Sequence, residues 1–484
     1  MVAMALAGVA LAGFGAAQGG AGGGGFAPGH GAGSPAAVAT DALVIPLATG
    51  STTIYYVSSS DGNDSDDGTT EALAKQTLTA GIALLTSGTD CRLLLKRGDV
   101  WTNENLGVMN KGGASAAGPL VIGAYGTGDR PLIKIGTGTG ISTINGGQNA
   151  HVAFQDLEFY AHTRDPGSAD YVDETGGFGL SWLSGANNVV FERVTFRYCA
   201  NNRVQDFGNF GIQSMTFKDC DFLDSYNTAA HAQGLYFEPT LEATGLFGPV
   251  VFDGCVFDHN GWNDDSTPVA PKTLFNHGLY TQNSDYAAST IISNVANLTV
   301  KRCVFLRNAS HGVQMRSGGT VKDNLFVRCA ISVLIGSGDN PTAGGVLALV
   351  KDNVILQGTD IVANPRGLAI ELDNIDTGTT TTVSGNRIAN VADVGINNAA
   401  VFGAAATDAT LSDNIASVWI YSTPVASEQL TATTSGLADP TRSLATYDTT
   451  RGGPGTAANA YTMIRSRSYL LADLLVYFRA GLNP

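Results

Sequence analysis

The chain has 484 residues, of which 44% are hydrophobic and only 14% are charged. This composition supplies enough apolar side chains for a large core and excludes an intrinsically disordered chain. A formal net charge of −15 repels nucleic acids and anionic membranes, which excludes both as main partners.

Residues 1–50 form a Gly/Ala-rich N-terminal arm without a strand pattern. Residues 1–18 are apolar like the core of a signal peptide, but the expected basic leader is missing, since the first Lys or Arg is Lys75. The apolar run is broken by glycines and is too short to span a bilayer. Two interpretations remain open: a cleaved secretion signal, or a retained anchor that attaches the protein to a larger particle.

An amphipathic segment, residues 71–86, follows the arm and a first strand that starts near Ile54. We expect it to be a helix that covers the open end of the repeat described next and protects an exposed strand edge.

A sequence motif then recurs nine times. The copies are HVAFQDLEF (151–159), NVVFERVTF (188–196), SMTFKDCDF (214–222), PVVFDGCVF (249–257), NLTVKRCVF (297–305), GGTVKDNLF (318–326), LALVKDNVI (347–355), TTTVSGNRI (380–388) and DATLSDNIA (408–416). Alternation within each half indicates a strand, and the slipped spacing between the halves indicates a tight bend. The mean period of about 32 residues is typical of a solenoid.

The middle position of the motif predicts a ladder inside the solenoid. It is occupied in turn by Leu157, Val194, Cys220, Cys255, Cys303, Asn324, Asn353, Asn386 and Asn414. Stacked asparagine amides can bond the turns above and below and satisfy buried polar groups. We expect the cysteines to be buried, neighbouring and unbridged, because parallel Cβ vectors give a poor disulfide geometry; bridges are the alternative.

A second strand of each coil begins with glycine, as in GLSWL (179–183), GLYFE (234–238), GLYTQ (278–282), GVQMR (312–316) and GLAIE (367–371). Period-two alternation sends Leu235, Leu279 and Val313 inward and the residues after them outward. The outward positions should form a polar and aromatic strip along the solenoid.

The C-terminal part has two predicted sections. Residues 422–456, rich in Thr, Ser and Gly, are expected to be a connector. Residues 457–479 are expected to be one helix that is stopped by Gly481 and Pro484. The predicted organisation is an arm (1–50), a β-helix (51–421), and a connector with a C-terminal helix (422–484).

Three segments, IYYVSSSDGNDSDDGTTEALAKQTL (54–78), LLLKRGDVW (93–101) and LVIGAYGTGDRPLI (120–133), resemble the opening of pectin-lyase-like proteins. The resemblance extends over about residues 54–420 and implies an all-β fold, a right-handed parallel β-helix with a capping helix. It also implies a polysaccharide ligand, since this superfamily contains polysaccharide lyases, glycoside hydrolases, epimerases and phage tailspikes. The lyase signature, a basic residue beside acidic calcium ligands, is not found at a definite position.

The richest stretch for chemistry is 224–316. We expect catalytic groups among Glu238, His277, His311, Arg316 and Asp264, and sugar-binding groups among Tyr236, Tyr280, Gln282, Gln314, Trp262 and His231. Aromatic faces stack on sugar rings, and carboxylates and amides bond hydroxyls. Each group also has a purely structural interpretation. The tyrosines could pack against neighbouring strands, and the histidines could bond the backbone of turns. Asp264 and Asp265 could lie in a solvated loop or form a calcium site. No residue is assigned to a metal.

The leading hypothesis is a polysaccharide-recognising spike, similar to a tailspike, with depolymerase activity as an open question. It would act as a homotrimer at an extracellular or virion surface. A secreted bacterial polysaccharide lyase or hydrolase is the first alternative, and a structural β-helix adhesin without catalysis is the second.

Overall fold

The computed structural model describes residues 45–144, 147–172, 176–207, 210–238, 248–282, 292–293, 297–336, 345–359, 361, 366–375, 381–389, 399–403, 409–417, 430–431, 437–439 and 441–483. These residues all belong to one unit, Gly33–Pro484. The predicted domain limits at residues 50 and 421 remain predictions.

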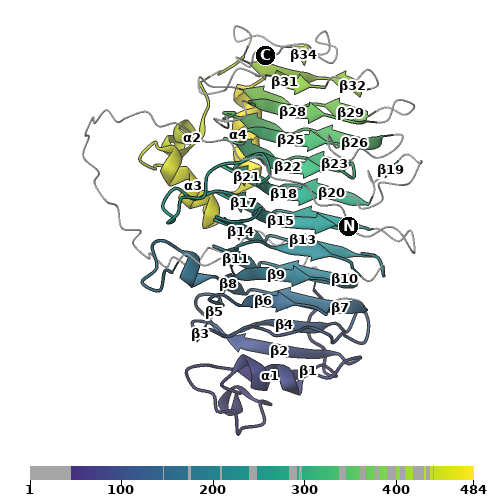
Figure 1. The fold of residues 1–484 in the computed structure, drawn as a ribbon, viewed down its shortest axis with the longest axis vertical. Coiled ribbons are helices and arrows are strands. Elements are labelled where there is room, and N and C mark those ends of the chain that lie inside the picture. Colours follow the sequence, from purple (N-terminus) through teal and green to yellow (C-terminus); the bar gives the residue numbers. More distant parts are fainter. Residues whose placement is uncertain are drawn as a thin grey trace, which may run out of the picture. The chain divides into compact units, whose positions relative to one another are not determined.

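Three parallel sheets carry the strands, and each complete coil contributes one strand to each sheet (Figure 1). Sheet A contains, in stacking order, β1 (Thr53–Val57), β2 (Cys91–Lys96), β4 (Leu120–Tyr125), β7 (Gln148–Gln155), β10 (Gly185–Glu192), β13 (Met215–Lys218), β16 (Val250–Asp253), β20 (Leu298–Lys301), β23 (Gly319–Lys322), β26 (Val346–Lys351), β29 (Thr381–Ser384) and β32 (Ala409–Ser412), and β19 (Ile292–Ser293) pairs with β26.

Sheets B and C complete the coil. Sheet B contains β3 (Val100–Thr102), β5 (Leu132–Lys134), β8 (Glu158–Tyr160), β11 (Thr195–Arg197), β14 (Asp221–Leu223), β17 (Val256–Asp258), β21 (Val304–Leu306), β24 (Leu325–Val327), β27 (Val354–Leu356), β30 (Arg387–Ala389), β33 (Asn414–Ser417) and β34 (Leu430–Thr431). Sheet C contains β6 (Thr139–Ser142), β9 (Phe178–Trp182), β12 (Arg203–Gln205), β15 (Gln233–Glu238), β18 (His277–Thr281), β22 (His311–Met315), β25 (Ile331–Ile335), β28 (Leu368–Leu372) and β31 (Ala399–Phe402). The predicted parallel β-helix is confirmed.

The predicted ladder lies at the corner between sheets A and B. Both the backbone N and the side-chain Nδ2 of Asn324 donate to Asn353 Oδ1, at 3.1 and 2.9 Å. Asn353 bonds Asn386 in the same way, and Asn386 bonds Asn414. Cys303 precedes them in the column and donates its backbone N to Asn324 Oδ1. The asparagine ladder is therefore confirmed.

The cysteines are buried and free, as predicted. The thiol of Cys255 donates to Phe217 O at 3.3 Å, and that of Cys303 donates to Phe252 O at 3.6 Å. Burial raises the pKa of Cys220 and of Cys255 well above the ordinary value, so these thiols stay protonated and act as donors.

Phenylalanines fill the interior in two parallel stacks. One follows sheet B with ring centroids 4.8–5.5 Å apart and consists of Phe159, Phe196, Phe222, Phe257, Phe305 and Phe326. The other follows sheet A and consists of Phe154, Phe191, Phe217 and Phe252. Each ring stacks on the equivalent ring of the preceding coil, because parallel in-register pairing places equivalent side chains beside one another.

The N-terminal cap differs from the single helix predicted for residues 71–86. A 3₁₀ turn, η1 (Glu71–Leu73), and a short helix, α1 (Leu78–Leu84), are separated by an extended segment. Lys75 lies in that segment and exchanges backbone hydrogen bonds with β1, which breaks the helix. Thr77 then caps α1, and Leu78 and Gly81 pack over the first coil; a methyl group on Gly81 would lie 2.5 Å from Val57.

The C-terminal part also corrects the prediction, since its described residues form three helices and not one. They are α2 (Leu444–Thr450), inside the expected connector, α3 (Ala457–Arg465) and α4 (Leu471–Gly481). Arg467, with a φ of 60°, interrupts the predicted helix between α3 and α4. Ser443 begins α2 with a capping box. This signal was not distinguished in the sequence because the whole segment is rich in Thr and Ser. The predicted stop at Gly481 is confirmed.

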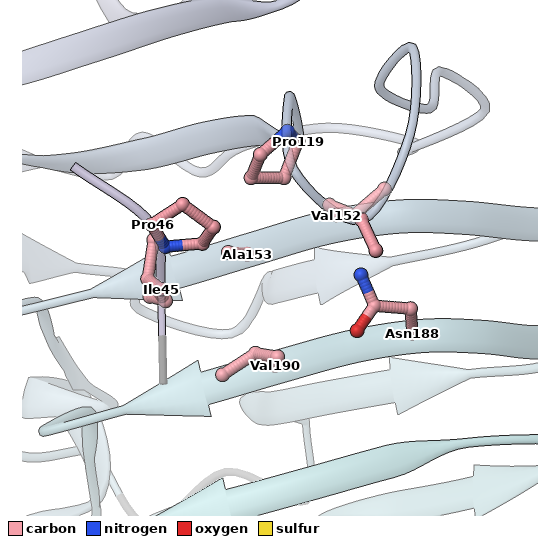
Figure 2. Close-up of a pocket in the computed structure, with 8 residues that line it drawn as sticks. Ile45, Pro46, Pro119, Val152, Ala153, Asn188 and Val190 are labelled. Atoms are coloured by element: carbon pink, nitrogen blue, oxygen red, sulfur yellow. The ribbon is translucent and has the colours of Figure 1, made fainter. Parts of the chain in front are cut away.

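The residues before β1 pack on the outer face of sheet A, as Figure 2 shows. Ile45 is buried against Val121, Ala153 and Val190 of three successive strands. Arg92 donates to the carbonyl oxygen of Pro46. The end of the predicted arm thus belongs to the packed structure. No helix within the described ranges is long and apolar enough to cross a lipid bilayer.

Candidate functional site

The outer face of sheet C carries a row of half-exposed polar and aromatic side chains over β9, β12, β15 and β18. We call this row the sheet-C strip. Its partly exposed members are Phe178, Arg203, Gln205, Tyr236, Glu238 and Tyr280, and it also includes the buried Ser181. In-register pairing places Ser181 beside Arg203, Arg203 beside Tyr236, and Tyr236 beside Tyr280. Leu235, Leu279 and Val313 point into the core, as predicted.

Arg203 is the cationic centre of the strip. Its Nε donates to Ser181 Oγ at 3.0 Å, and its guanidinium lies 5.3 Å from the ring centre of Phe178. Burial lowers the pKa of Arg203, and within the described ranges no carboxylate forms an ion pair with it. The guanidinium can therefore bind an anionic ligand group without displacing a protein carboxylate.

Glu238 is the last residue of β15, on the coil that follows that of Arg203. Its Oε2 accepts a hydrogen bond from Gln205 Nε2 at 2.7 Å. The sequence motif did not reveal Arg203, Ser181, Gln205 or Phe178 as site residues. The strand of Arg203 is only three residues long and lacks the leading glycine of its neighbours, but its Arg-Val-Gln alternation was a usable signal.

Tyr236 and Tyr280 form the aromatic centre. Their rings meet edge to face, with centroids 5.1 Å apart. The Tyr280 hydroxyl donates to Gln282 Oε1 at 2.6 Å, and the Arg316 guanidinium lies 5.2 Å from the Tyr280 ring centre. The structure therefore gathers three other predicted site residues, Tyr236, Gln282 and Arg316, around Tyr280.

His277 and His311 form a buried pair beside the tyrosines. Their Nδ1 atoms are 2.7 Å apart, and the His277 ring meets Tyr280 at 5.1 Å. Two Nδ1 atoms at this distance share one proton, so one ring donates and the other accepts. Burial lowers the pKa of His277 well below its ordinary value and that of His311 to about 3, and Arg316 adds to both shifts. Both rings are neutral at neutral pH.

The strands β22 and β25, which follow β18 in sheet C, are buried at every position. Gln314 faces outward but is only 5% exposed, and His311 and Gln282 are equally buried. Ile331, Leu334 and Leu368 form a separate buried apolar cluster farther along the same face. The Nε2 of His311 and the Oε1 of Gln314 have no hydrogen-bond partner in the part of the chain that the structure describes. Among the described strands, the partly exposed side chains of the strip therefore lie on the N-terminal side of the predicted site.

Trp262, Asp264 and His231 lie at the corner between sheets B and C. Trp262 Nε1 donates to Arg307 O at 2.7 Å, and Lys272 lies 4.2 Å from the Trp262 ring centre. Asp264 is exposed.

His231 is exposed and stacks on Phe275, with centroids 5.1 Å apart. It lies close enough to His277 to lower the pKa of that histidine. His231 is therefore the corner residue that borders the buried histidine pair.

A calcium site at Asp264 and Asp265 does not fit the residues present. Over the described ranges, no three His, Cys, Asp or Glu side chains converge as metal ligands. The backbone N–H of Asp265 donates a hydrogen bond to Asn263 Oδ1, as is common in turns.

No protein-family model and no curated protein matches the chain. Solved structures of similar fold include a rhamnogalacturonan lyase, 14% identical, with 75% of this chain and 87% of that chain covered and a TM-score of 0.43. The pectate lyase Pel9A is 15% identical, with 81% and 84% covered and a TM-score of 0.47. An alginate lyase from Paenibacillus sp. str. FPU-7 is 10% identical, with 69% and 97% covered and a TM-score of 0.39. At these identities the similarity concerns the fold.

Proposed function

We propose that the protein binds an extended polysaccharide along the sheet-C strip. The observation that carries this proposal is the uninterrupted row of half-exposed aromatic, amide and charged side chains over four stacked strands. Strands about 4.8 Å apart give the row a length of about 14 Å, which suits a linear ligand parallel to the solenoid axis.

The chemistry of the strip supports a sugar ligand. The tyrosine rings offer apolar faces for sugar rings, while Gln205 and Glu238 can bond hydroxyl groups. Arg203, which has no carboxylate partner within the described ranges, favours a polymer that carries acidic sugars. This local cation offsets the repulsion that a net charge of −15 would otherwise exert on such a polymer.

Tyr280→Ala tests the binding site. We expect weaker binding of polygalacturonate, alginate or dextran, whichever the parent protein binds most tightly, with an unchanged melting temperature. Tyr125→Ala is the matched control, because Tyr125 and Tyr56 form a similar edge-to-face pair, also 5.1 Å apart, near the outer face of sheet A. Equal affinity of Tyr280→Ala and the parent would place the ligand on another face.

Depolymerase activity is a second candidate, favoured by the carboxylate of Glu238 inside the strip. Glu238→Gln keeps the shape and removes the charge, so cleavage should stop while binding persists. If the release of reducing ends is equal in both proteins, Glu238 is not an acid or base. If the parent releases none, the non-catalytic adhesin is favoured.

We further propose that the protein works as a homotrimeric spike at an extracellular or virion surface, attached to a larger particle by residues 1–50. The Gly/Ala-rich composition of this arm supports an anchor with few contacts of its own. Mass spectrometry of the N-terminus distinguishes a retained anchor from the cleaved signal of a secreted lyase or hydrolase. Light scattering of the purified protein tests the trimer.

A further inference from the structure

A loop that leaves sheet C directly after the strip presents two phenylalanines to solvent. Phe207 is 50% exposed and Phe210 is 43% exposed, whereas Phe217, Phe222 and Phe237 on neighbouring strands are fully buried. Exposed apolar surface rimmed by polar side chains is typical of binding sites, and these two rings are exposed within four residues of one another beside the polar strip. We call Phe207 and Phe210 the phenylalanine platform.

The two ends of this loop are fixed. The buried carboxylate of Asp206 accepts a hydrogen bond from Gly211 N at 2.5 Å, and Asp206 N donates to Glu238 O on the next coil at 3.3 Å. Phe210 packs so closely on Gly185 that a methyl group there would lie 2.6 Å from the Phe210 Cβ. The backbone at Asp206 and Gly211 is therefore held in place, so ligand binding need not order the two ends of the loop.

The platform continues the strip. Phe207 is two residues beyond Gln205, whose amide bonds Glu238. Ile144, 49% exposed, lies two residues beyond Ser142, which pairs with Ser181 of the strip. Apolar surface is thus added at the end of the sheet-C strands, where the polar strip stops.

We infer that the phenylalanine platform is a second subsite for the polysaccharide, on which the apolar face of a sugar ring packs. This inference rests on the proposed function of the strip. Flat aromatic rings give a large contact area and prefer defined stacking geometries. Because phenylalanine has no polar group, the subsite adds affinity for longer chains without selecting their charge.

The test compares the Phe207→Ser/Phe210→Ser double variant with the parent. The probe is the polysaccharide of the panel that the parent binds most tightly, used as a polymer and as short oligosaccharides. We expect affinity for the polymer to fall at least about tenfold, the equivalent of about 1.4 kcal/mol. Affinity for the short oligosaccharides should change less, and the melting temperature should stay the same.

Phe275→Ser is the matched control, since Phe275 is 56% exposed but lies at the other end of the sheet-C strands. It should bind like the parent. Unchanged polymer binding by the double variant, while Tyr280→Ala loses binding, would overturn the platform but not the strip. A change of oligomeric state in the double variant would instead assign the phenylalanines to a contact between copies of the chain. If the parent binds no polysaccharide of the panel, the strip and the platform both fail.

Discussion

At the residue scale, two corners of the coil each pair a residue of positive φ with a following residue whose side chain points inward. At the corner between sheets B and C, Asp224, His259 and Arg307 have φ values of 50–59°, and the next residues turn inward. Asn260 donates its N and Nδ2 to Asn308 Oδ1, at 3.2 and 3.0 Å, in the geometry of the first ladder. This second ladder escaped the sequence comparison because the segments that follow it differ in length from coil to coil.

Cysteine replaces asparagine as the donor in both ladders. Cys303 Sγ donates to Phe252 O in the preceding coil, just as Asn324 Nδ2 donates to Val300 O. Cys329 continues the second column after Asn308 and directs its thiol to Phe305 O. A thiol and an amide thus serve the same corner, which explains why both residue types occur in the same column.

Substitutions in the first ladder test whether a thiol and an amide are equivalent donors at this corner. Asn353→Leu removes the bonds to Asn386 and leaves buried groups unpaired, so unfolding should become easier by about 1–3 kcal/mol. Cys303→Asn should keep the stability within about 1 kcal/mol, because the amide replaces the thiol as donor. Urea unfolding measures both. Parent-like stability of Asn353→Leu would contradict the ladder, and a large loss in Cys303→Asn would contradict the equivalence.

The buried histidine pair should make stability depend on pH. The folded state holds the pKa of His311 at about 3 and that of His277 well below its ordinary value, mainly through burial. The groups facing the pair, Arg316, Arg366 and His231, are basic and oppose protonation. Because the unfolded chain takes up protons near pH 6.5, this contribution is complete above that pH and is lost as the pH falls toward 3.

The His277→Gln/His311→Gln double variant tests the pair. Between pH 7 and pH 4 the parent should lose on the order of 2–4 kcal/mol more stability than the variant. Denaturant unfolding at several pH values measures the difference, and His231→Gln, at an exposed position, should behave like the parent. Parallel pH profiles of the parent and the double variant would mean that the pair is accessible to protons in the folded state.

At the element scale, the outer face of sheet B changes from polar to apolar along the solenoid. From β14 to β30 it presents Leu223, Val256, Val304, Leu306, Leu325, Val327, Val354, Leu356 and Ala389, which cluster with side chains of α2, α3 and α4. Figure 1 shows these helices beside that part of sheet B. Strands such as Val304–Leu306 are apolar at every position because both of their faces are covered.

Ion pairs fix the helices to the sheet. Arg465 of α3 bonds Asp224 and Asp258, both at 2.6 Å, Arg467 bonds Asp221, and Arg479 bonds Asp323. Asp258 is fully buried, and the neighbouring cations hold the pKa of Asp224 far below its ordinary value.

Arg465→Met should therefore destabilise the protein by about 2–4 kcal/mol, because it removes a partner from two buried carboxylates. The matched control is Arg451→Met, whose partner Asp473 is exposed, and its cost should be about 0–1 kcal/mol. Limited proteolysis near residue 440 and urea unfolding measure the effect. Equal stability of the two variants would mean that apolar packing alone holds the C-terminal helices.

At the scale of the whole molecule, Ile45 packs on sheet A although it lies within the predicted arm. Deletion of residues 1–40 should leave the melting temperature unchanged and abolish attachment to any larger particle. Deletion of residues 1–47 also removes Ile45 from Val121, Ala153 and Val190, and should cost about 1.5–3 kcal/mol. Calorimetry of the two deletions separates the arm from the packed segment. Loss of folding in the shorter deletion would show that residues 1–40 belong to the core.

The sequence by itself determined the coils, the ladder from Asn324 to Asn414, the inward Leu235 and Leu279, and the free cysteines. These features repeat from coil to coil, so each copy confirms the others and the period is visible along the chain. The tertiary structure alone decided that Arg203 lies between Ser181 and Tyr236, that His277 meets His311, and that Gln314 is covered. It also decided that α3 docks on sheet B through Arg465. These contacts join residues from different coils or loops of unequal length, and no local period encodes such pairings.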